Sequence, residues 1–89
     1  MDGSTLRARL ASHGKVTGHR DGHWTLRLVR PAEENFDTQS LWRVVHREIP
    51  GAVLNLWRCR RAADRYFEVH EVLFRLGPAP ESRMVESAA

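Results

Sequence analysis

The pattern of apolar and polar residues predicts a helix at the start of the chain. In the segment STLRARLASHG, Leu6 and Leu10 lie one helical turn apart, Ser4 is suited to cap the first turn, and Gly14 is suited to end the helix. This predicts a helix of about two and a half turns. Its apolar stripe is narrow, so we expect the helix to pack against the rest of the chain.

The next segment, KVTGHRDGHWTLRLVRP, predicts a β-hairpin. Asp21-Gly22 is a strong signal for a two-residue type I′ turn, which pairs His19 with Trp24 and Thr17 with Leu26. The second strand ends before a proline, which cannot donate to a ladder. This register gives the second strand an inner face of Trp24, Leu26 and Leu28 and an outer face of His23, Thr25, Arg27 and Val29, with Arg20 opposite His23.

A second helix is predicted at residues 38–49. Asp37 is suited to the N-cap, and Phe36 before it is spaced to pack on Leu41 as a hydrophobic staple. Pro50-Gly51 forbids continuation beyond the predicted end. Apolar residues recur at helical spacing within it, at Leu41, Trp42, Val45 and Ile49.

The segment AVLNLWRCR predicts a strand with apolar side chains on both faces. Strict alternation places Leu54 and Leu56 on one face and Val53, Trp57 and Cys59 on the other. Apolar residues on both sides suggest either an interior position in the sheet or a partner over the outer side.

Residues 62–76 fit two patterns. A helix would carry an apolar stripe and stop at Gly77-Pro78, whereas the aromatic run RYFEV after the turn-like RAADR would make a fourth strand; the pattern favours the helix. The predicted fold is therefore a small α+β domain over residues 1–77, in the order α-β-β-α-β-(α or β). Its antiparallel sheet has helices on one face. Residues 78–89 are small and polar, and we expect a disordered tail.

Composition adds limits on location. The chain has 89 residues, which suits one domain with a small core, and no apolar run of about 18 residues that would predict a membrane helix. No secretory signal is recognisable after Met1, and a single cysteine cannot form an internal disulfide, so we expect a cytoplasmic protein without a membrane partner.

Candidate chemistry is sparse. The predicted hairpin register sends His19 and His23 to opposite faces, so they would not share a metal ion. Cys59 is flanked by arginines, which make a thiol more reactive, but no spacing ties a histidine such as His46 or His70 to it. The sequence therefore predicts no catalytic residue, no metal site and no cofactor, and we expect a protein that is not an enzyme.

Two binding functions remain. Lys and Arg number 14 against 11 Asp and Glu, and only Lys15 is lysine; a GC-rich coding sequence would produce the same arginine bias without any function. The favoured hypothesis is a protein-interaction module that binds a partner protein or self-associates, because Trp, Tyr and Arg dominate interface energetics. The alternative is a DNA- or RNA-binding domain with Trp57 available for stacking. Both hypotheses use the same surface residues, namely Arg20, His23, Arg27, Trp57, Arg58, Arg60, Arg61 and Arg65.

Overall fold

The computed structural model describes residues 1–77 and confirms a small α+β domain with one antiparallel sheet. The predicted tail at 78–89 lies outside the described residues. The strands are arranged in the order β1-β2-β4-β3. The elements in chain order are α1 (Gly3–Leu10), β1 (Lys15–Gly18), β2 (His23–Pro31), the 3-10 turn η1 (Ala32–Glu34), α2 (Thr38–Glu48), β3 (Ala52–Arg61) and β4 (Phe67–Leu76).

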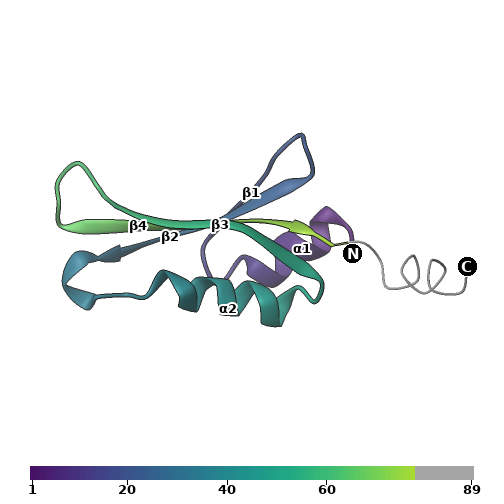
Figure 1. Cartoon of the computed structure of the whole chain (residues 1–89), viewed down its shortest axis with the longest axis horizontal. Coiled ribbons are helices and arrows are strands. Elements are labelled where there is room, and N and C mark those ends of the chain that lie inside the picture. The colour runs from purple at the N-terminus through teal and green to yellow at the C-terminus, as the bar shows by residue number, and fades with distance from the viewer. Residues whose placement is uncertain (78–89) are drawn as a thin grey trace, which may run out of the picture.

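The domain has two layers. Figure 1 shows the sheet nearly edge-on, with α1 and α2 below it and the β1–β2 and β3–β4 turns rising on the opposite side. One face of the sheet is therefore covered by helices; we call the other the open face. Neither helix within residues 1–77 is long and apolar enough to cross a membrane.

Both helices begin at an aspartate. The Asp37 side chain accepts a hydrogen bond from the backbone N–H of Gln39 at 3.0 Å, which confirms the predicted N-cap of α2. In α1 the cap is Asp2, which accepts from the N–H of Thr5 at 2.8 Å, and not Ser4 as predicted. The helix starts one residue before Ser4, so that residue already lies inside the first turn.

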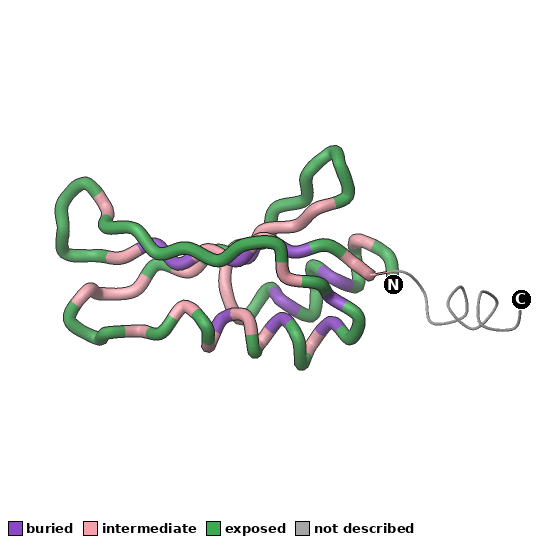
Figure 2. The backbone as a smooth tube through the Cα atoms, in the orientation of Figure 1, coloured by how far each residue is buried: buried purple, intermediate pink, exposed green. Residues whose placement is uncertain are grey.

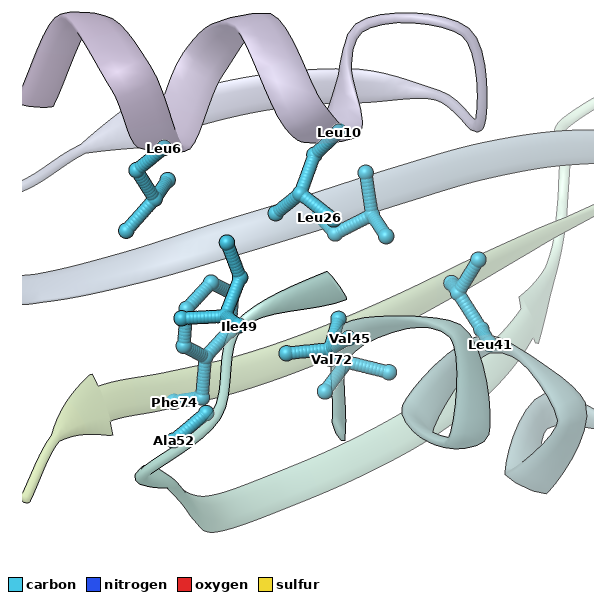
Figure 3. Packing of buried hydrophobic residues seen from close by; sticks show 9 residues of the cluster. All are labelled: Leu6, Leu10, Leu26, Leu41, Val45, Ile49, Ala52, Val72 and Phe74. Atoms are coloured by element: carbon cyan, nitrogen blue, oxygen red, sulfur yellow. The ribbon is translucent and has the colours of Figure 1, made fainter. Parts of the chain in front are cut away.

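The core lies between the helices and the sheet. Leu6 and Leu10 of α1 are fully buried, which confirms the predicted stripe. Buried positions line the inner sides of the helices and the middle of the sheet (Figure 2). Figure 3 shows how the helix side chains meet those of the strands, in the cluster Leu6, Leu10, Leu26, Leu41, Val45, Ile49, Ala52, Val72 and Phe74.

The predicted register of the β1–β2 hairpin is wrong by one residue. Thr17 pairs with Thr25 and not with Leu26, and the backbone N–H of His19 donates to the carbonyl of His23 at 2.8 Å. The loop has three residues, and Gly22 takes the left-handed conformation with φ of 88°. A three-residue loop with glycine in this position is the alternative to the two-residue turn. Since side chains alternate along a strand, the shift changes which first-strand residues share a face with the second strand.

A bulge in β3 overturns the predicted alternation of that strand. Leu54 pairs with Phe74 but Leu56 pairs with Leu73, so Asn55 is the extra residue. Leu54 packs on the core, whereas Leu56 faces the open side. The two leucines therefore lie on opposite faces and not on one. The strand is also at the edge of the sheet, so the interior position suggested by the sequence belongs instead to β4.

Residues 67–76 form a strand, and the helix favoured from sequence is wrong. β4 pairs with β2 on one side and with β3 on the other. Val72 and Phe74 are buried beneath the helices, while Val69 is buried on the open face. A central strand with apolar residues on both faces lacks a clear alternation, which is why its pattern resembled that of a helix.

Candidate functional site

Charged side chains form a row across the open face. The pairing register aligns Lys15 of β1, Arg27 of β2, Glu71 of β4 and Arg58 of β3, one residue from each strand. Residues opposite one another in adjacent strands have Cβ atoms about 5 Å apart, so the four side chains are neighbours. We call this set the charged row; it contains three cations and one carboxylate.

The Glu71 carboxylate is shared between two arginines of β3. Its Oε1 atom lies 3.2 Å from Nε of Arg58 and 3.7 Å from Nε of Arg60. The Glu71 side chain is 14% exposed, whereas the Arg58 and Arg60 side chains are 60% and 57% exposed. None of the ion pairs within residues 1–77 involves Lys15 or Arg27. The row therefore keeps excess positive charge at the surface.

Apolar side chains flank the charged row on both sides. Leu56 is 47% exposed and packs beside Leu73 in the row Thr25–Leu73–Leu56, and Val29 is 45% exposed opposite Val69. Val53 also points to this side and is partly exposed. No helix among the described residues covers these side chains. An uncovered sheet face with exposed apolar residues is a typical binding surface.

The β1–β2 turn bounds a hollow of about 390 Å³ on the open face. The ring of His19 is fixed there by a 2.7 Å hydrogen bond between Nε2 and the Thr25 hydroxyl. The hollow is lined by His19, Asp21, His23, Thr25, Leu56, Arg58, Glu71 and Leu73.

Asp21 organises this turn. Its Oδ1 atom accepts the backbone N–H of His23 at 3.0 Å, and this bond holds the pKa of the Asp21 carboxyl below its usual value. The same oxygen lies 3.0 Å from Nδ1 of His23, so the imidazole also faces this carboxylate. The carboxylate therefore contacts both the backbone and the side chain of His23.

The corrected register brings His19 and His23 to one face, against the sequence prediction. Both imidazoles line the hollow, although they do not belong to a cluster of three metal-ligating side chains within residues 1–77. The cause is the longer turn, since a shift of one residue transfers a side chain to the other face.

The surface residues predicted from sequence do not form one patch. His23, Arg27, Arg58 and Arg60 lie on the open face. Arg20 lies in the β1–β2 turn, and Arg65 lies in the β3–β4 turn with φ of 63°. Trp57 and Arg61 pair with Val72 and Glu68, so they point to the face that carries the helices.

Strand pairing also joins a cysteine and a histidine that sequence spacing did not connect. Cys59 and His70 are cross-strand partners, with 4.0 Å between Sγ and Nε2. The sequence would have predicted this pair if residues 67–76 had been assigned as a strand. The position of the β3–β4 turn then sets Cys59 opposite His70.

No family model, no curated protein and no solved structure matches the chain.

Proposed function

We propose that the protein is a non-enzymatic interaction module whose open face binds an acidic surface of a partner protein. The observation that carries this proposal is the charged row, with its excess of cations, between exposed apolar side chains on a face that no described helix covers. Interfaces combine apolar area with arginine in this way. The partner would supply carboxylates opposite Lys15, Arg27 and Arg58, and apolar side chains opposite Leu56 and Val29.

Charge argues for a different protein over a second copy of this chain. Two open faces packed together would bring the cations of one charged row near those of the other. Like charges across an interface are costly, and each copy offers only one carboxylate in that row. Complementary charge would instead both attract and orient an acidic partner.

Nucleic acid is the competing ligand, because phosphate would satisfy the same cations. Stacking on an aromatic side chain usually accompanies such cations when single strands are bound. Trp57 is partly exposed, but it lies on the opposite face from Arg58 and Arg60. This placement favours a protein ligand.

Site-specific photo-crosslinking in cells tests the proposal. A photo-reactive amino acid replaces Leu56 on the open face or, as the matched control, its neighbour Trp57 on the other face; the two are 47% and 42% exposed. We expect a discrete protein adduct at position 56 and none at position 57. The adduct should identify a protein with an acidic surface and should survive nuclease.

The purified partner then allows a charge test with a second matched pair. Arg58→Glu changes the open face and Arg61→Glu the opposite face, and these arginine side chains are 60% and 61% exposed and each pairs with a glutamate. We expect Arg58→Glu to weaken binding at least about tenfold and Arg61→Glu to leave it unchanged. An adduct destroyed by nuclease, an adduct of two copies of this chain, or equal loss in both variants would overturn the proposal.

A further inference from the structure

Three potential metal ligands converge on the helix-covered side of the sheet, away from the open face. Cys59 on β3 lies opposite His70 on β4, and Glu68 precedes His70 by two residues, so all three side chains share one face. The Nε2 atom of His70 is 4.0 Å from Sγ of Cys59 and 3.7 Å from Oε1 of Glu68. The three ligand atoms lie within 4.8 Å of one another.

The imidazole of His70 is held so that Nε2 points at the other two groups. His70 is fully buried, and its Nδ1 atom is 2.8 Å from the hydroxyl of Thr38, the first residue of α2. The ring of Phe36 packs on it edge to face, with 4.9 Å between ring centres. Metal-binding histidines characteristically use their second nitrogen in such a hydrogen bond, which fixes the ring.

The ligand set and its spacing suit zinc. Thiolate, imidazole and carboxylate are the groups that bind zinc, and two such ligands on one tetrahedral ion are about 3.4 to 3.6 Å apart. The separations from His70 are 3.7 and 4.0 Å, and all three ligand atoms lie within 4.8 Å of one another, so side-chain rotation would bring them to these distances around an ion. A thiol ligand also disfavours magnesium and calcium, which prefer oxygen.

We propose that Cys59, Glu68 and His70 bind one zinc ion or a similar divalent transition-metal ion. Cys59 is exposed, so the fourth coordination position would face solvent and would take water or a side chain from another molecule. Arg61 lies 3.7 Å from Oε2 of Glu68 and would orient the carboxylate from outside the coordination sphere. Without metal, His70 contacts the Cys59 thiol and the Glu68 carboxylate, and Glu68 also pairs with Arg61.

Cobalt and zinc titrations of the untagged full chain test the site. Cobalt should bind with a stoichiometry of one and give thiolate-to-cobalt charge-transfer absorption together with the d–d bands of a four-coordinate ion. Zinc should displace the cobalt and raise the melting temperature. Cys59→Ser should abolish the charge-transfer absorption and weaken zinc binding at least about tenfold.

Three further variants distinguish metal binding at this cluster from non-specific metal binding by other histidines. His46→Gln removes an exposed histidine outside the cluster and should change nothing. Thr38→Val leaves the ligands in place and should weaken zinc binding about tenfold or more while the charge-transfer absorption persists. Glu68→Gln should weaken zinc binding but retain the thiolate-to-cobalt charge-transfer absorption. Circular dichroism of each variant serves as the control for folding.

Several outcomes would overturn the proposal. They are the absence of zinc binding by the unaltered chain at millimolar concentration, a cobalt spectrum without a sulfur signal, and equal zinc affinity in Cys59→Ser and the unaltered chain.

Discussion

The two faces of the sheet bury their side chains to very different degrees, although the same four strands supply both. Beneath the helices, Leu26, Val72 and Phe74 are completely buried. On the open face, Leu56 and Val29 keep nearly half of their surface in solvent. The first face therefore contributes most of the buried apolar surface, and the second leaves apolar side chains in solvent.

The difference teaches that residue type alone does not assign a side chain to the core. Leu26 in β2 and Leu56 in β3 are both leucines in one sheet, yet only Leu26 lies under a helix. Burial of a leucine is worth about 1.5 to 3 kcal/mol, so its stabilising contribution depends on the face it occupies.

The largest expected change in the free energy of unfolding comes from truncating a buried leucine, compared with an exposed leucine on the open face. Leu26→Ala should lower the free energy of unfolding by about 2 to 5 kcal/mol, because it leaves a cavity in the core. Leu56→Ala should cost about 0.5 kcal/mol, as at other surface positions. Urea denaturation measures both. If Leu56→Ala proved as costly as Leu26→Ala, the open face would be covered in solution, and the measurement should then be repeated over a range of protein concentrations.

The next effect concerns the helix that covers the inner face. Asp37→Ala removes the acceptor for the Gln39 N–H and should destabilise the protein by about 1 kcal/mol. Asp37→Asn keeps a side-chain oxygen and should cost only a few tenths of a kcal/mol. Thermal or urea unfolding followed by circular dichroism distinguishes the two, and equal losses would mean that the cap bond is not the cause.

A smaller loss of stability is expected when the carboxylate of the charged row, Glu71, is neutralised. Glu71→Gln removes the ion pairs with Arg58 and Arg60, whose side chains are largely in solvent, and should lower stability by less than about 1 kcal/mol. The loss should shrink further in concentrated salt, because exposed charges are screened. Unfolding measured at low and high salt, together with Arg58→Gln and the double variant, isolates the pair. A loss independent of salt would contradict the ion-pair explanation.

The smallest effect concerns Asp21 at the rim of the open face. Its pKa is lowered in the folded state, chiefly by the backbone N–H of His23, so its stabilising contribution is present above the ordinary carboxyl value of 3.8 and is lost as the pH falls through the folded-state value. Asp21→Asn should therefore lower stability slightly at neutral pH, leave it nearly unchanged in strong acid, and so make stability less dependent on pH on the acid side. Melting temperatures between pH 2 and 7 check this; an unaltered acid slope would contradict it.

Local signals predicted the helices and the position of the hairpin turn. The aspartate cap, the apolar spacing and Pro50-Gly51 located α2 at 38–48 against the predicted 38–49, since these features act within a few residues. Asp21-Gly22 correctly marked the turn. Its loop length was not predicted, because both turn types accept the same two residues.

The candidate site was only partly predictable. Arg27, Arg58 and Arg60 were identified from sequence and lie together on the open face. Trp57 was expected beside them, but adjacent residues of a strand point to opposite faces, and it lies on the other side. The Cys59–His70 pair was missed because it exists only if residues 67–76 form a strand.

Caps, turn residues and apolar spacing act between residues close in the chain, so the amino-acid sequence was sufficient to predict the α+β class, both helices and a hairpin turn. The faces of the strands depend on register, and register depends on contacts between strands. The three-residue turn brought His19 and His23 together, the Asn55 bulge separated Leu54 from Leu56, and pairing on both sides made residues 67–76 a strand. Each of these features decides which face of the sheet a side chain lies on, and therefore which side chains become neighbours.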